Sequence, residues 1–117
     1  MKFLCIVFVD EKKLAALTRD EFQALDEASV ASDKEMRRSG HLLAAQALEP
    51  VHAASTVMVR NRKPIITDGP FSETKEQVGG FLLLEARDRE EAIALVSKVP
   101  VASYAAIEVR PVRELRG

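Results

Sequence analysis

Two side chains in this sequence have the chemistry to move a proton near neutral pH, His41 and Asp68. His41 follows the expected C-terminal end of a helix, where a positive charge is favoured, so a surface cap is one interpretation. A general acid or base is the other, because histidine titrates near neutral pH. We name His41 and Asp68 as the candidate catalytic residues. The second histidine, His52, has no metal-like spacing to the first, and no metal site is expected.

Asp68 opens a polar turn within ITDGPFSETKEQVGG, residues 65–79. Its carboxylate is expected to accept hydrogen bonds from the backbone N–H groups of Phe71 and Ser72, because proline has no N–H to offer. Gly69 can adopt the backbone angles that other residues avoid. Phe71 is expected to anchor the turn on apolar surface. The pattern predicts a rigid turn held by Asp68.

The second half of this segment carries a possible capping motif and two glycines. Thr74 and Gln77 fit a T-x-x-Q capping box for a short helical turn. Gly79 and Gly80 would let a backbone or a ligand approach closely.

Two interpretations of the segment stay open. It is either a well-capped turn with solvated charges or the polar lining of a pocket, since loops on a rigid scaffold commonly carry binding groups. The candidate ligand-binding residues are Asp68, Gly69, Pro70, Phe71, Lys75 and Glu76.

Composition limits the class of protein. The chain has 117 residues and a formal net charge of −1, with an apolar share of 47% and a charged share of 30%. These values predict one globular domain, residues 1–117. Because like charges form no block and aromatic residues are few, nucleic acid is not an expected partner. The single cysteine, Cys5, lies in the apolar run KFLCIVFV and is expected to be a buried, inert thiol.

Targeting and cofactor signals are also weak. The apolar run at the start is too short for a secretory segment, and nothing approaches the roughly 20 apolar residues that span a bilayer. We therefore expect a cytoplasmic protein with no membrane partner. No glycine-rich dinucleotide motif follows the first strand, where VDEKK stands, and no cofactor is expected.

The elements that must position these residues follow from periodicity and capping signals. Thr18 and Glu21 form a capping box for a helix over 18–39 that Gly40 ends, and Asp88 caps a second helix over 88–99. Strands are expected at 2–9, 41–48, 55–60, 63–67, 79–86 and 105–112, with Asn61 and Arg62 turning a hairpin.

The order of these elements predicts an α+β fold of the ferredoxin-like type, β-α-β, a hairpin, then β-α-β. Such a fold has an antiparallel sheet with two helices on one face. Residues 2–9 nevertheless read as a strand covered on both faces. We expect the second cover to be another subunit, and therefore a homodimer with its sheets packed face to face.

The stretch TDGPFSETKEQVGGF, residues 67–81, resembles the signature of the DGPF family within the YCII-related superfamily. The typical form is TDGPFAETKEQLGGY, from which this chain differs at Ser72, Val78 and Phe81. SGHLLAAQALEP and IEVRPV match as well, so the resemblance covers nearly the whole chain. It implies a dimeric α+β barrel of ferredoxin-like subunits.

The resemblance implies function only broadly. Relatives in the superfamily carry a His–Asp pair, and one branch removes chloride from a chlorinated hydroxyhydroquinone. This chain lacks the histidine in its first helix and has Val99 where the aspartate would precede Pro100. We expect a small polar or aromatic metabolite to bind in a cleft of the barrel, with proton transfer of the isomerase or lyase type. The alternative is a non-catalytic sensing or partner module linked to extracytoplasmic-function sigma factors.

Overall fold

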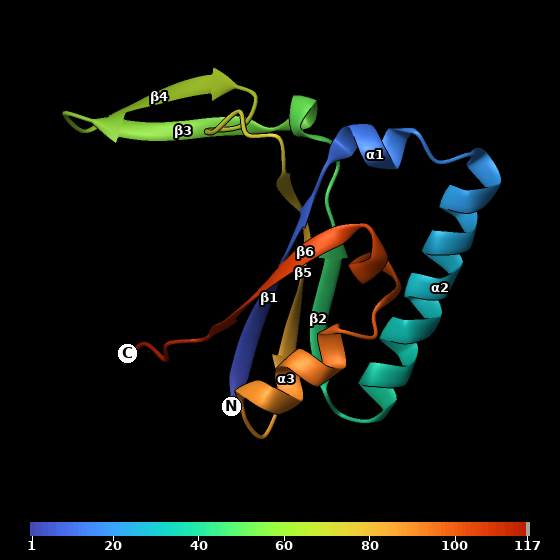
Figure 1. The fold of residues 1–117 in the computed structure, drawn as a ribbon. Helices are drawn as coiled ribbons and strands as arrows, with labels where there is room; N and C mark the ends of the chain where they lie inside the picture. Colours follow the sequence, from blue (N-terminus) through green and yellow to red (C-terminus); the bar gives the residue numbers. More distant parts are fainter. Residues whose placement is uncertain (117) are drawn as a thin grey trace.

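A four-stranded antiparallel sheet, helices on one of its faces and a separate two-stranded hairpin make up this chain (Figure 1). The computed structural model describes residues 1–116. The elements in chain order are β1 Lys2–Val9, α1 Glu11–Ala15, α2 Arg19–Arg38, β2 Leu42–Ala47, η1 Val51–Ala53, β3 Ser55–Arg60, β4 Lys63–Asp68, β5 Gln77–Glu85, α3 Arg89–Val96, η2 Pro100–Ser103 and β6 Ala105–Pro111.

The sheet has the strand order β2-β5-β1-β6, with every neighbouring pair antiparallel. Strands β1 and β5 form its centre, and each is connected to an edge strand by a helical crossover. This is the ferredoxin-like arrangement, and the predicted fold class is confirmed. Both helices cover the same face, because Met36 of α2 and Val96 of α3 belong to one core cluster with Cys5.

The core lies between this face and the helices. Alternate residues of β1, from Phe3 to Val9, are buried, while Leu4, Ile6 and Phe8 between them are half-buried on the opposite face. Strand β1 is thus fully covered on one side only. The second subunit that the sequence analysis expected on the other side stays a prediction.

Helix α2 begins and ends as its sequence predicts. The Thr18 hydroxyl accepts from the Glu21 backbone N–H at 3.1 Å, and the Glu21 carboxylate accepts from the Thr18 N–H at 2.9 Å, which completes the capping box. Gly40 follows the helix with a φ of +82°, a backbone angle that glycine adopts without strain. Asp88 caps α3 by accepting from the Glu91 N–H at 2.9 Å.

Element boundaries differ from the predicted ones at a few places. Helix α3 stops at Val96 instead of residue 99, and β5 begins at Gln77 instead of residue 79. The five-residue helix α1 was not predicted, because so short a segment shows no helical periodicity. It is initiated by Asp10, whose carboxylate accepts from the Lys12 N–H at 3.0 Å.

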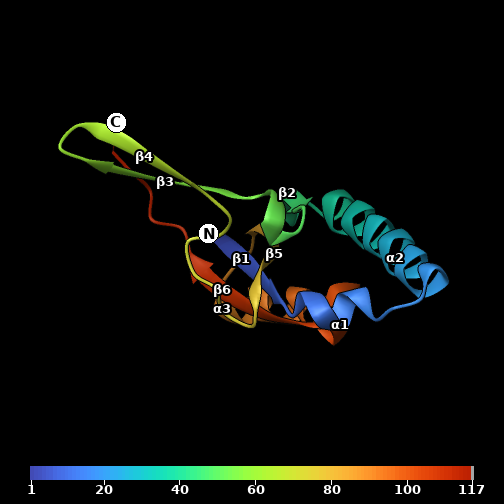
Figure 2. The same cartoon turned by 90° about the horizontal axis from the view of Figure 1, so that it is seen from above.

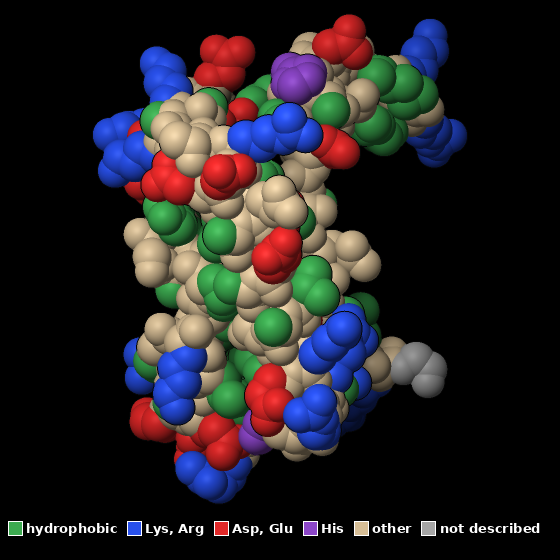
Figure 3. Space-filling model, turned by 90° about the vertical axis from the view of Figure 1, so that its right-hand side faces the viewer, with side chains coloured by type: hydrophobic (Ala, Val, Ile, Leu, Met, Phe, Trp, Pro, Cys, Tyr) green, Lys and Arg blue, Asp and Glu red, His purple; other side chains and the backbone are tan. Residues whose placement is uncertain are grey.

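The β3–β4 hairpin, residues 55–68, projects away from the main sheet, and we call it the arm (Figure 1). Asn61 and Arg62 turn it with φ values of 51° and 64°, as a two-residue hairpin loop requires. Figure 3 shows hydrophobic side chains along the projecting hairpin at the upper right and cationic side chains near its end. The predicted hairpin is confirmed, and it forms a sheet of its own.

No helix within residues 1–116 is both long enough and apolar enough to cross a membrane.

Candidate functional site

A cleft of about 980 Å³ lies between α2 and the sheet. Its volume is at the upper end of the range typical of small-molecule sites. Figure 2 shows the elements that enclose it, with α2 on one side, the sheet on the other and α1 near one end.

The composition of the inward stripe of α2 explains why this space stays open. The helix turns Leu25, Ser29, Ser32, Asp33 and Met36 toward the sheet, and of these only Met36 is buried. Two hydroxyls and a carboxylate in the middle of a helix face cannot fill the gap that large apolar side chains would fill. The helix is therefore packed at its C-terminal end and leaves a cleft along its N-terminal half.

The cleft has an apolar floor with polar groups around it. Strands β1, β2 and β5 provide the floor, and η2 closes one side. The apolar side chains that line it include Val7, Val9, Leu14, Leu17, Phe22, Leu25, Ala45, Leu82, Val99 and Val101. The charged and polar ones are Glu11, Lys12, Thr18, Arg19, Asp26, Ser29, Asp33, Gln46 and Glu49. A flat molecule with an apolar body and polar substituents suits such a lining.

The environment of Asp33 in this lining changes the pKa of its carboxyl group. Partial burial raises the pKa of the Asp33 carboxyl above its ordinary value, and the positive charge of Arg37 one turn away opposes this shift. A carboxyl that gains protons at higher pH than usual is suited to exchanging a proton with a bound molecule. Ser29, one turn earlier on the same stripe, places a hydroxyl beside it in the lining.

Short contacts from α1 hold the mouth of the cleft. Asp10, which is buried, starts the helix, and the Glu11 carboxylate accepts from the Val51 backbone N–H at 3.0 Å. Residues 40 positions apart in the sequence are thereby joined at this edge. The mouth of the cleft is therefore held by specific hydrogen bonds.

A second cavity of about 710 Å³ lies on the other side of α1. It brings Pro70 and Lys75 of the predicted ligand-binding set together with Lys12 and the buried Asp10. Glu11 and Lys12 line both cavities. The segment after β4, residues 69–76, which we call the DGPF turn, therefore lies close to the mouth of the cleft.

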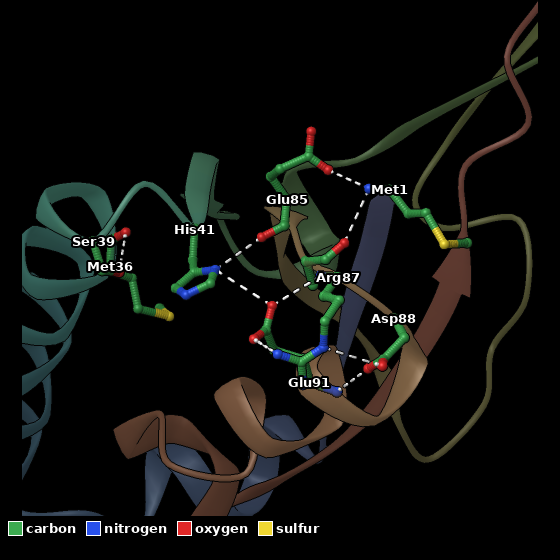
Figure 4. Close-up of polar contacts among 9 residues, drawn as sticks. Met1, Met36, Ser39, His41, Glu85, Arg87, Asp88 and Glu91 are labelled. Atoms are coloured by element: carbon green, nitrogen blue, oxygen red, sulfur yellow. Dashed lines mark hydrogen bonds and ion pairs between the residues drawn. The ribbon is translucent and has the colours of Figure 1, made fainter.

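His41 lies at the opposite end of the sheet in a cluster that joins four segments (Figure 4). Its Nδ1 donates to the backbone carbonyl of Glu85 at 3.0 Å and lies 3.9 Å from Oε1 of Glu91. The Met1 ammonium group contacts the Glu85 carboxylate at 2.6 Å and lowers its pKa. Through these contacts His41 connects β2, β5 and α3, which is a structural role.

His41 and Asp68 are not brought together within one chain. The backbone of His41 pairs with Glu85, which is opposite Lys2 at the start of β1, whereas the segment after Asp68 enters the sheet at Gln77, opposite Val9. Lys2 and Val9 are seven positions apart along β1, on the order of 23 Å at about 3.3 Å per residue. Asp68 itself lies opposite Ser55 in the arm, beyond that end of the sheet, so the two side chains do not meet within the single chain. A contact between them across a dimer stays a prediction.

The DGPF turn is held by groups other than the ones predicted. Gly69 adopts a φ of +95° and its N–H donates to Ala54 at 2.7 Å. Thr56 donates to the Gly69 carbonyl at 2.8 Å. The Asp68 carboxylate takes part in none of the hydrogen bonds found for this segment in residues 1–116. The expected Asx turn is therefore corrected, and a tie between the arm and the turn replaces it.

Two further expectations for this turn were wrong. Phe71 is 78% exposed and anchors nothing within its own chain. Residues 72–76 form bends and no helical turn, so there is no T-x-x-Q capping box. Gln77 instead donates its side-chain amide to the carbonyls of Ser72 at 2.7 Å and Thr74 at 3.0 Å, which wraps the loop around one side chain. Glu76 is exposed.

In residues 1–116 no group of three or more His, Cys, Asp and Glu side chains is placed to hold a metal ion. The carboxylates and cations that border the cleft come from α1, α2 and the segment after β2.

Comparison with known proteins identifies the class. The YCII-related domain family matches residues 1–116. This chain therefore belongs to the YCII-related family, and the resemblance seen in its DGPF segment is confirmed.

Two relatives show how far the likeness extends. An uncharacterized protein from Rhizobium meliloti (strain 1021) is 30% identical over 113 residues, which cover 95% of this chain and 91% of that protein. The 5-chloro-2-hydroxyhydroquinone dehydrochlorinase from Burkholderia phenoliruptrix AC1100, solved in complex with 2,5-dihydroxybenzoquinone, has a TM-score of 0.55 and 19% identity, covering 97% of this chain and 94% of that one. At this identity the likeness concerns the fold. A role linked to sigma factors gains no support from either relative.

Sequence reasoning did not identify Asp33, although a signal for it was present. Hydroxyl and carboxyl side chains stand at the inward positions of an otherwise well-capped helix, where large apolar residues are the norm. Such a stripe indicates either a weakly packed helix or a polar wall of a cavity. The structure shows that both descriptions apply to α2.

Proposed function

We propose that the cleft between α2 and the sheet binds a small hydroxylated aromatic molecule, and that Asp33 exchanges a proton with it. The observation that carries this proposal is a partly desolvated carboxyl in the wall of an apolar cleft. The apolar floor suits the ring, and Asp33 with Ser29 suits its hydroxyl groups. A structural relative that binds a dihydroxylated quinone ring supports the choice of ligand class.

The proposal revises the residues assigned to proton transfer. Neither His41 nor Asp68 is among the residues that line this cleft. Asp33 takes their role, because its carboxylate can accept the hydroxyl proton of a bound phenol and return it after rearrangement of the ring. His41 is assigned to holding the sheet end together.

Binding should follow the ionisation of Asp33. Hydroquinone, which is neutral at pH 7, is the probe, and calorimetry measures its affinity between pH 4 and 8. Because ionised Asp33 accepts the hydroxyl, affinity should fall as the pH drops through the raised pKa of Asp33. Asp33→Asn should weaken binding about tenfold, the worth of one charge-assisted hydrogen bond, and remove this pH dependence.

Two matched controls separate the cleft from the helix. Glu35→Gln removes an exposed carboxylate two positions away and should leave affinity unchanged. Ser29→Leu narrows the cleft and should weaken binding, whereas Ala28→Leu on the exposed side should not. Binding that is equally insensitive to Asp33→Asn and Ser29→Leu contradicts the proposal.

We also propose that the chain forms a homodimer through the sheet face opposite the helices. Leu4, Ile6 and Leu83 lie on that face, half-buried and without a covering layer in their own chain. Apolar side chains there are stabilised by a second copy in an isologous contact. Sedimentation at micromolar concentration should give a mass of about twice the 12.9 kDa of one chain. A mass of one chain at that concentration excludes the dimer.

A further inference from the structure

One face of the arm is aliphatic except at its base, where it carries the pair Ser55–Asp68. Residues that are directly opposite in an antiparallel pair share a face, and Val57 is opposite Ile66 while Val59 is opposite Pro64. The other face carries the pairs Thr56–Thr67, Met58–Ile65 and Arg60–Lys63. The two faces of one hairpin therefore differ in chemistry, and only the first is a continuous apolar surface.

This aliphatic face is bare within the single chain. Val57 and Val59 are each 59% exposed and Ile66 is 67% exposed. All six residues of β4 are exposed. An isolated two-stranded hairpin is marginally stable in water, so an arm with this composition requires a surface to pack against.

The direction of the arm indicates which surface that is. In Figures 1 and 2 the arm extends from the sheet on the side away from α2. The helices cover the face of the sheet that Cys5 and Val7 share with Met36. The arm thus overhangs the open face, which carries Leu4 and Ile6 and to which the homodimer was assigned above.

We propose that the arm packs its aliphatic face against a second copy of this chain and clasps the dimer. The inference rests on the proposed homodimer and adds a contact that the sheet face alone does not provide. In a two-fold assembly each arm reaches the other copy, so the contact occurs twice.

The available area shows why the arm and the sheet must act together. With about 60–120 Å² of side-chain surface per aliphatic residue, the exposed part of the arm face is roughly 200 Å². A stable interface buries about 800 Å² per partner. The arm alone is too small to hold a dimer, so most of the interface would have to come from the open sheet face.

The test compares adjacent positions on opposite faces of β4. Ile66→Lys places a charge in the aliphatic face, and Thr67→Lys places the same charge on the other face. Both positions are exposed in the single chain, so neither substitution should lower the thermal stability of the folded monomer. Sedimentation should show a dimer dissociation constant about tenfold or more higher for Ile66→Lys, and unchanged for Thr67→Lys.

Cross-linking locates the arm directly. Val59→Cys is labelled with a photo-cross-linker while buried Cys5 stays unreacted. Mixed copies with natural and ¹⁵N isotopes then show whether each cross-link joins two chains. Cross-links between chains support the inference, and cross-links only within one chain overturn it.

The outcomes separate the two proposals. A wild-type monomer removes the homodimer and the clasp together. A wild-type dimer that Ile66→Lys weakens no more than Thr67→Lys leaves the homodimer and removes the clasp. A monomer that binds an anionic polymer through the cationic arm tip, Arg60, Arg62 and Lys63, replaces both with a different partner.

Discussion

Gly80→Ala should lower the free energy of unfolding by about 2–3 kcal/mol, the cost of forcing extra volume into a well-packed site. A Cβ at this position would lie 2.7 Å from the carbonyl oxygen of Gln46 and 3.3 Å from Cα of Ala47. Both are backbone atoms of β2, so the edge strand would have to move away from β5. Glycine-to-alanine changes otherwise stabilise by reducing the entropy of the unfolded chain, which makes the sign of this effect diagnostic.

Gly79→Ala is the matched control for this result. Its Cβ would lie 2.7 Å from Cγ2 and 3.3 Å from Cγ1 of Val9, a buried side chain, so this variant should also be destabilised, but without displacing the backbone of a neighbouring strand. Gly79 is also the extra residue of a β-bulge, since Val7 pairs with Gly80 and Phe8 pairs with Val78. Chemical denaturation should rank Gly80→Ala as the more damaging change. Equal and small losses for both variants would show that β2 does not depend on this close approach.

Cys5 should react with a thiol reagent at least about 100-fold more slowly in the native protein than in the unfolded chain. Burial raises the pKa of its thiol from 9.0 to about 11, so the reactive thiolate is about 100-fold scarcer at pH 8. The side chain is also 0% exposed, which excludes the reagent. Between pH 9 and 11 the unfolded chain ionises and the native one does not, so native stability should fall as the pH rises through this window.

The labelling measurement has an internal reference. In a Thr67→Cys variant a second thiol lies at an exposed position on the other face of the arm, and it should react at the rate of a free thiol while Cys5 does not. One thiol per chain should then be labelled under native conditions and two in denaturant. Rapid labelling of both in the native state contradicts the burial of Cys5.

The amino-acid sequence by itself determined the six strands, the two longer helices and their order, but not α1, η1 or η2. The sequence patterns that indicate an element are local. The capping box of Thr18 and Glu21 involves atoms three residues apart. The turn at Asn61 and Arg62 likewise needs only two adjacent residues. The apolar run at residues 2–9 likewise indicated the strand that the structure has as β1, although its alternating burial was not predicted. The ferredoxin-like fold follows from that order, and the DGPF segment indicated the YCII-related family to which the chain belongs.

Only the tertiary structure decided which polar residues meet. His41 and Asp68 are each plausible proton carriers, but the strand register places them at opposite ends of β1. Phe71 is a natural anchor by type, yet its exposure depends on surfaces that distant segments provide. Asp33 looked like an ordinary helix residue, and its pKa is raised by a partial burial that only the folded chain provides. Burial, register and cavity volume depend on contacts between residues far apart in the chain, which no local pattern records.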